Sequence, residues 1–273
     1  MKKKIAFAVL NRNAPDLTNK FVERMIEHLG GHISLEDVFV LENGSSPEMH
    51  SKYANIIETN SYGVGWGMNK LVNHCYDLGY DYIWLNHNDV YLEDPAGFLN
   101  WSMNLFERDK SVGTTLPWKD SWQWGLNCGE LGRNNKDQNV SFWDHISTIF
   151  SRKTIELTKS FDSQFTPFDS SNFGGHYLML CPALALYSNR MRVVTNSKYL
   201  VEEINLYTEN NKENLSSNVR GFGDQEWKKV VGPDSVRLWF DKLFPNEKNS
   251  SYNIKEKRNM LIRKVAEYAA RSN

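Results

Sequence analysis

The triplet His87-Asn88-Asp89 could hold a divalent metal ion, because it places an imidazole and a carboxylate in one short turn. It follows residues 82–85, an apolar run with the composition of a buried strand. A hard cation such as Mg²⁺ or Mn²⁺ takes carboxylate oxygen and can also bridge the oxygens of a diphosphate. We therefore predict Asp89 and His87 as metal ligands and Mn²⁺ or Mg²⁺ as the cofactor. Mn²⁺ tolerates imidazole better than Mg²⁺ does. The alternatives are that His87 and Asn88 only end the strand, or that Arg or Lys replaces the metal.

Two earlier apolar runs, residues 4–10 and 37–41, also end in polar turns. In an open α/β sheet, the carboxyl ends of parallel strands form the edge where ligands bind. Glu42 could accept a hydrogen bond from a pyrimidine N–H there, although the residues after it could simply form a turn. The polar residues that follow these two runs are Asn11 and Arg12, and then Glu42, Asn43 and Ser45.

A glycine-rich segment, residues 60–69, lies between the second and third of these turns. Glycines let a backbone approach a ligand closely, and the N-terminus of a following helix attracts a diphosphate. We expect that helix to start at Met68. The alternative is a plain turn in which Asn69 caps or braces the helix. The candidate ligand-binding residues of this segment are Asn60, Gly63, Gly65, Gly67 and Asn69.

The elements that must position these turns alternate between strand and helix through residue 90. This order predicts an α/β fold with a mostly parallel sheet flanked by helices. The predicted strands in this part are 4–10, 37–41, 54–58 and 81–85, and the helices are 15–29 and 68–78. Further along we expect helices at 92–106, 153–159 and 177–187, strands at 111–116, 145–151 and 191–195, and a C-terminal helical extension at 254–270.

Length and composition indicate a single domain, residues 1–273, of which 40% are hydrophobic and whose formal net charge is −1. We divide it into a ligand-binding half (1–110), a second half (111–205), and a mobile segment with the C-terminal helix (206–273). The near-zero charge gives no indication of a nucleic-acid or membrane partner. The three cysteines form neither a zinc spacing nor a disulfide framework. With no signal peptide and no transmembrane segment in the sequence, we expect a cytoplasmic protein.

The chain has nine tryptophans, and several cluster among polar residues and glycines. Flat aromatic faces in such surroundings suit sugar rings or bases, and the equally weighted alternative is a loop-rich region with tryptophan as its core. The clustered residues are Trp118, Trp122, Trp124 and Trp143.

Together these motifs resemble the nucleotide-sugar glycosyltransferases of the GT-A fold, in particular family 2 and its rhamnosyltransferase-like members. The resemblance covers residues 4–90 firmly and 111–168 more weakly. It rests on the order of several elements: the polar turn after the first strand, the E-N-G-S-S turn at 42–46, N-S-Y-G-V-G-W-G-M-N at 60–69, N-H-N-D at 86–89, and F-D-x-x-F at 161–165. The third is close to the family's N-x-G-x-x-x-G-x-N, and the fourth stands where the family has D-x-D or N-x-D. Two positions depart from the family pattern, because Glu42 replaces an aspartate and His87 replaces the first acidic residue of the metal motif.

The resemblance implies a metal-assisted, inverting enzyme that moves a sugar from a UDP- or dTDP-sugar to an acceptor hydroxyl. The acceptor would be a saccharide of a surface polysaccharide; a modified DNA base is less expected without a basic charge. Trp122 and Trp124 would stack on the acceptor, and Asp169 or His176 would take its proton. The implied donor-binding residues are Asn11, Arg12, Glu42, Asn43, Ser45, Asn60, Gly63, Gly65, Gly67, Asn69 and Asn88.

Two other functions remain open from the sequence. A nucleotidyltransferase uses a similar sheet and metal, but it usually has a glycine-rich loop after the first strand, and residues 11–15 contain no glycine. A catalytically inactive protein could bind a nucleotide or sugar with the same fold. The oligomeric state is left open.

Overall fold

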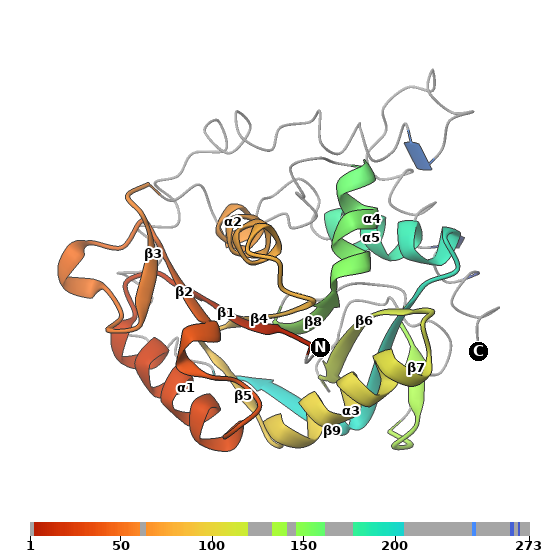
Figure 1. The fold of residues 1–273 in the computed structure, drawn as a ribbon, viewed down its shortest axis with the longest axis horizontal. Helices are drawn as coiled ribbons and strands as arrows, with labels where there is room; N and C mark the ends of the chain where they lie inside the picture. Colours follow the sequence, from red (N-terminus) through yellow and green to blue (C-terminus); the bar gives the residue numbers. More distant parts are fainter. Residues whose placement is uncertain are drawn as a thin grey trace.

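The computed structural model describes residues 3–60, 64–119, 133–140, 146–161 and 177–204, and the isolated residues 242, 243, 263, 264 and 267. Within these ranges a central sheet carries helices on both faces (Figure 1). The predicted segment 206–273 and its helix at 254–270 lie almost entirely outside the described residues. No described helix is long and apolar enough to cross a bilayer.

The strands of the sheet lie in the order β3-β2-β1-β4-β8-β6-β9-β5, with β7 beside β9. β1 pairs in parallel with β2 and β4, whereas β8 is antiparallel to both of its neighbours, β4 and β6. The strands are β1 (Ile5–Asn11), β2 (Val38–Asn43), β3 (Ala54–Glu58), β4 (Tyr82–His87), β5 (Val90–Leu92), β6 (Val112–Trp118), β7 (Asp137–Asn139), β8 (Ser147–Ser151) and β9 (Arg192–Glu203). The helices are α1 (Pro15–His28), α2 (Val64–Asp77), α3 (Pro95–Arg108), α4 (Arg152–Phe161) and α5 (Tyr177–Ser188), with 3₁₀ turns at Leu35–Asp37 and Pro47–Met49.

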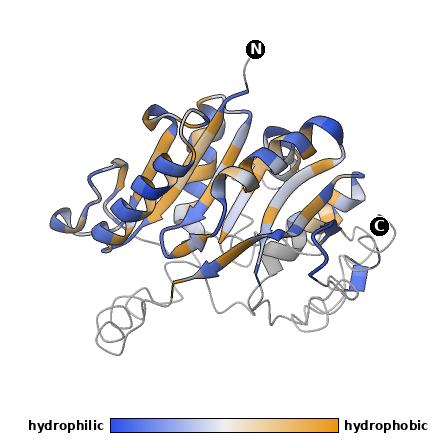
Figure 2. Ribbon diagram, turned by 90° about the horizontal axis from the view of Figure 1, so that it is seen from below, coloured by the Kyte–Doolittle hydropathy of each residue, from blue (hydrophilic) through white to orange (hydrophobic). Residues whose placement is uncertain are grey.

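Two hydrophobic cores lie on opposite faces of the sheet, because successive strand side chains point to opposite sides. In β1, Ala6 and Ala8 belong to the core under α2, α4 and α5, and Phe7 and Val9 belong to the core under α1 and α3. Figure 1 shows the same division of the helices between the faces. In Figure 2 hydrophobic residues concentrate on the strands, and hydrophilic residues cover much of the outer surface of the helices.

Helix α2 starts at Val64 and not at Met68, so Gly65 and Gly67 lie in its first turn and not in a loop. The early start follows from close packing, since a Cβ on Gly67 would lie 2.6 Å from Leu10 Cδ1. A side chain at this position would hold the helix away from β1. The glycines therefore allow the helix to begin against the sheet, although glycine is a poor helix former.

Three predicted boundaries around the second half of the sheet were also wrong. The predicted helix at 92–106 is preceded by the short strand β5, and it starts at Pro95, after Asp94 caps it by accepting a hydrogen bond from Gly97 N. The predicted strand at 191–195 continues to Glu203, because backbone pairing with β6, β7 and β5 extends it through polar residues. The strand β7 was not predicted, and it lies between the predicted strands at 111–116 and 145–151.

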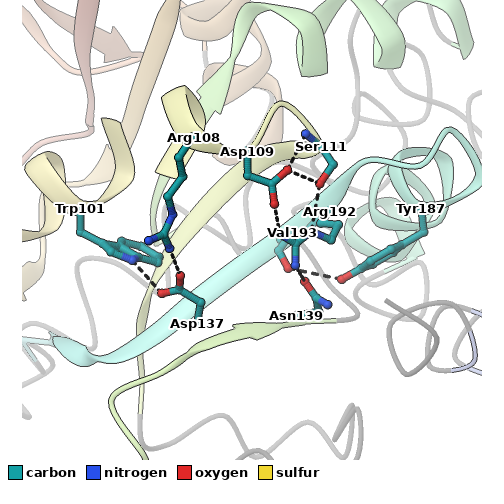
Figure 3. A network of polar contacts seen from close by, with 9 residues as sticks. All are labelled: Trp101, Arg108, Asp109, Ser111, Asp137, Asn139, Tyr187, Arg192 and Val193. Carbon is teal, nitrogen blue, oxygen red and sulfur yellow. Dashed lines mark hydrogen bonds and ion pairs between the residues drawn. The ribbon is translucent and has the colours of Figure 1, made fainter. Parts of the chain in front are cut away.

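Polar contacts attach β7 to its neighbours (Figure 3). The Asp137 carboxylate accepts hydrogen bonds from Trp101 Nε1 at 2.8 Å and Asn196 Nδ2 at 2.9 Å, and it pairs with Arg108. At the other end of the strand, Arg192 donates to Asn139 Oδ1 at 3.1 Å. These contacts fix β7 against α3 and β9.

Candidate functional site

Asn11 and Glu42 lie opposite each other at the carboxyl ends of β1 and β2, where they are partners in the parallel register. Both side chains are fully buried. Asn11 Nδ2 donates to both carboxylate oxygens of Glu42, at 3.0 Å to Oε1 and 2.8 Å to Oε2. The backbone N–H of Ser51 also donates to Oε1, at 2.7 Å. The Glu42 carboxylate is therefore held by protein donors from two sides.

Thr18 of α1, which no sequence motif indicated, joins Asn11 to Asn88 of the turn after β4. Its buried hydroxyl donates to Asn11 Oδ1 at 2.9 Å and accepts a hydrogen bond from Asn88 Nδ2 at 2.8 Å. Ala14 N also donates to Asn11 Oδ1, at 3.2 Å. The sequence contained one indication that Thr18 is buried. It lies three residues before Phe21, on the buried face of the helix.

The turns after β1 and β2 are bonded to each other. Asn13 N donates to Ser45 Oγ at 3.0 Å, and Ser46 N donates to Asn13 Oδ1 at 3.1 Å. Gly44 adopts a φ of 73°, which favours glycine, while its N–H donates to Glu58 O at 2.9 Å. The two turns thus form one structured rim.

Arg12 lies half-buried on this rim. Desolvation lowers the pKa of Arg12. Because the ordinary pKa of a guanidinium is far above neutrality, the side chain keeps its charge at pH 7. The rim therefore carries a guanidinium that stays positively charged, and such a group suits a phosphate.

The metal candidate His87 ends β4, and the candidate Asp89 lies in the two-residue turn between β4 and β5. His87 Nδ1 lies 3.6 Å from Asp89 Oδ1, and the two side chains are 20% and 33% exposed. Two ligands about 2.1 Å from one ion lie roughly 3.0 Å apart at a right angle and roughly 4.2 Å apart when opposite. The observed 3.6 Å lies between these two values, so the two side chains are close enough to reach one cation. The described residues contain no cluster of three or more acidic, histidine or cysteine side chains that could hold a metal.

The first turns of α2 contain three candidate residues, Gly65, Gly67 and Asn69. Gly67 packs against Asn43, whose Cγ would lie 3.0 Å from a Cβ at position 67. Asn69 is 4% exposed, and neither polar atom of its side-chain amide has a hydrogen-bond partner in the structure. A buried amide without a partner costs about 1–3 kcal/mol, which suits a residue that contacts a ligand. Asn60 is exposed in the turn after β3.

Several predicted site residues lie outside the described part of the chain. They are Gly63, Trp122, Trp124, Asp169 and His176. Of the clustered tryptophans, Trp118 is described, and it is buried at the end of β6 with 8% of its surface exposed. For this residue the structure supports the core interpretation.

No protein-family model and no curated protein sequence matches this chain. Among solved structures, the mannosyltransferase PcManGT from Pyrobaculum calidifontis, in complex with GDP-Man and Mn²⁺, aligns over 100% of this chain and 86% of its own, with a TM-score of 0.53 and 12% identity. GalNAc-T7 with UDP, GalNAc and Mn²⁺ aligns over 74% of this chain and 44% of its own, with a TM-score of 0.52 and 6% identity. These likenesses concern the fold, which is the GT-A fold predicted from the sequence.

Proposed function

We propose that the protein is a metal-dependent glycosyltransferase that moves a sugar from a nucleoside-diphosphate sugar to an acceptor hydroxyl. The observation that carries this proposal is that the half-buried Arg12 and the His87–Asp89 pair, separated by 3.6 Å, follow adjacent parallel strands at one edge of a GT-A sheet. The names of the two similar structures add that each contains Mn²⁺ and a nucleotide or nucleotide sugar.

The residues of the edge divide into two roles in this proposal. Asn11 and Glu42 shape the pocket for the base, and Arg12 faces the diphosphate. His87 and Asp89 would hold Mn²⁺ or Mg²⁺, which when bound neutralises the charge that develops on the leaving diphosphate. Because Glu42 is fully buried and Asn11 and Ser51 already bond to its carboxylate, we assign Glu42 to positioning Asn11 and the turn after β2 beside the base.

The acceptor side of the proposal follows the sequence. Trp122 and Trp124 would stack on a saccharide acceptor, and Asp169 or His176 would remove the proton from its hydroxyl in an inverting reaction. A UDP- or dTDP-sugar donor, membership of family 2 with a rhamnosyltransferase-like role, and an acceptor in polysaccharide biosynthesis belong to this same proposal. A modified DNA base is the less favoured acceptor.

A thermal-shift panel of UDP, dTDP and GDP, with and without their sugars, tests the donor site. Each ligand is measured in Mn²⁺ and again in EDTA. A ligand at 100 times its Kd stabilises the folded state by about 2.7 kcal/mol, which corresponds to roughly 5–11 °C for a domain of this size. We expect at least one nucleotide to give such a shift in Mn²⁺ and a smaller one in EDTA.

The outcomes separate the three functions that the sequence left open. Absence of a shift with every nucleotide would contradict the proposed function. A shift without hydrolysis of any bound sugar donor would identify a non-catalytic binding protein. Release of pyrophosphate from a nucleoside triphosphate and a sugar phosphate would identify a nucleotidyltransferase.

A further inference from the structure

Building on the proposed function, we propose that Thr18 is a positioning residue for the metal-binding turn. Its hydroxyl links the nucleotide-side residues Asn11 and Glu42 to Asn88, which lies between the two candidate metal ligands. Thr18 is fully buried within α1, so its place in the site depends on the packing of that helix.

In the series of hydrogen bonds that runs from Glu42 to Asn88, each donor and acceptor is fixed by its neighbours. Ala14 N–H is a donor and bonds to Asn11 Oδ1, while the Glu42 carboxylate accepts from Asn11 Nδ2. The two contacts fix which way round the Asn11 amide lies. Since Asn11 presents its oxygen to Thr18, the Thr18 hydroxyl donates its hydrogen there and keeps only acceptor capacity for the next residue.

This direction determines the orientation of Asn88. The acceptor lone pairs of Thr18 require a donor, and Asn88 meets that requirement with Nδ2 at 2.8 Å. A second and longer contact joins the same nitrogen to Asn11 Oδ1, at 3.4 Å. The amide oxygen of Asn88 is left for other partners, and amide oxygen is a ligand type that hard cations accept.

Each residue of the segment His87-Asn88-Asp89 has a contact that holds it, and Thr18 supplies the contact from the α1 side. His87 N donates to Ile146 O at 2.9 Å, and Ile204 N donates to Asp89 O at 2.6 Å. Both of those are backbone contacts that any sequence could make. The contact between Thr18 and Asn88 is made by two side chains, so it depends on the identity of both residues.

The test is the gain in nucleotide affinity that Mn²⁺ provides, measured by calorimetry as the ratio of the UDP or GDP affinity in Mn²⁺ to that in EDTA. Thr18→Val keeps the shape and removes the hydroxyl, so we expect the ratio to fall about tenfold, the scale of one or two lost hydrogen bonds. The affinity in EDTA should stay within about twofold of the wild type, because Asn11 keeps its bonds to Glu42 and Ala14. Thr18→Ser restores the hydroxyl and should restore the ratio.

Thr158→Val is the matched control, because Thr158 is also a fully buried helical threonine. Its hydroxyl donates to Thr154 O at 3.0 Å and Ile155 O at 2.9 Å within α4. This variant loses a buried hydroxyl without touching the metal turn, so its affinity ratio should equal that of the wild type.

Asn88→Ala provides a second and independent measurement, which also applies if Thr18→Val does not fold. We expect it to lower the ratio as Thr18→Val does, and the double variant to lose no more than Asn88→Ala alone. A wild-type ratio in Asn88→Ala or in Thr18→Val, or equal losses in Thr18→Ser and Thr18→Val, would overturn the role of Thr18. Such results leave the proposed function standing, whereas a wild-type protein without any gain from Mn²⁺ would contradict both.

Discussion

Glu42→Gln is the substitution that most directly tests the hydrogen bonding of the candidate site. The change keeps the size of the side chain and replaces one carboxylate oxygen with an NH₂ group. If the remaining oxygen accepts from Ser51 N–H, the new amide nitrogen faces Asn11 Nδ2, in place of an acceptor 2.8 Å away. Rotating the glutamine turns its nitrogen toward Ser51 N–H. Flipping Asn11 brings Nδ2 against Ala14 N–H, which lies 3.2 Å from the present Oδ1. Every arrangement leaves two donors facing each other.

The magnitude follows from the burial of these groups, since Asn11 and Glu42 are both 0% exposed and water cannot replace the lost partner. A buried polar group without a partner costs about 1–3 kcal/mol. For a domain of this size, that loss lowers Tm by roughly 2–4 °C per kcal/mol. We expect urea denaturation to show a free energy of unfolding about 1–3 kcal/mol lower, with an unchanged m value.

Glu58→Gln makes the same chemical change at the end of the neighbouring strand β3. Glu58 pairs with Lys70 at 3.3 Å, and their side chains are 30% and 50% exposed. Exposed ion pairs contribute about 0–1 kcal/mol, so this control should lose little stability. If Glu42→Gln were no more destabilising than Glu58→Gln, the directional hydrogen bonding inferred for Asn11 would be refuted.

Three further substitutions test separate features of the structure. Asp89→Ala removes the proposed carboxylate ligand, so sugar transfer and Mn²⁺-dependent UDP binding should be lost with little change in Tm; undiminished turnover would reject the metal assignment. Gly67→Val should destabilise the fold in urea by about 1–3 kcal/mol, because a Cβ there would lie 2.6 Å from Leu10 Cδ1; wild-type stability would show that α2 adjusts freely. Hydrogen bonds from Ser111, and then from Arg192, lower the pKa of Asp109 below its ordinary value. The stabilising contribution of this carboxylate is therefore complete above the unfolded-state pKa of about 3.9 and is lost as the pH falls through the lower folded-state pKa. Asp109→Asn should then have a lower free energy of unfolding than the wild type at pH 7. A difference in free energy that stays the same in acid would contradict this.

The arrangement of the sheet edge could be predicted because it depends on strand ends. Apolar runs stop at polar residues, and parallel strands that stop there deliver those residues to one edge. Asn11 and Glu42 were placed on adjacent strands by this reasoning, and the register confirms the placement. Their burial and mutual hydrogen bonds were not predicted, because a strand pattern shows where a side chain lies along the chain but not which partner satisfies it.

Thr18 and the start of α2 were missed because hydrophobicity was the guide to both helices. A search for apolar spacing along α1 passes over a buried threonine, even though its position on the helix places it on the inner face. Likewise Gly65 and Gly67 favour a loop by their propensity, while tertiary packing against β1 requires small residues in a helix. In both cases the decisive contact comes from a neighbouring element, which a single segment of sequence does not show.

The turn that carries the two proposed metal ligands is held by contacts of the same kind. Asn88 and Asp89 form a two-residue connection between β4 and β5. A shift of the turn would change the separation of His87 Nδ1 and Asp89 Oδ1, now 3.6 Å, and with it the fit to one cation. A cation of the Mg²⁺ or Mn²⁺ type accepts only a narrow range of ligand distances. Contacts from Ile146, just before β8, from Ile204, just after β9, and from Thr18 of α1 therefore hold the turn, and Thr18 also bonds to Asn11, which we assign to the nucleotide side.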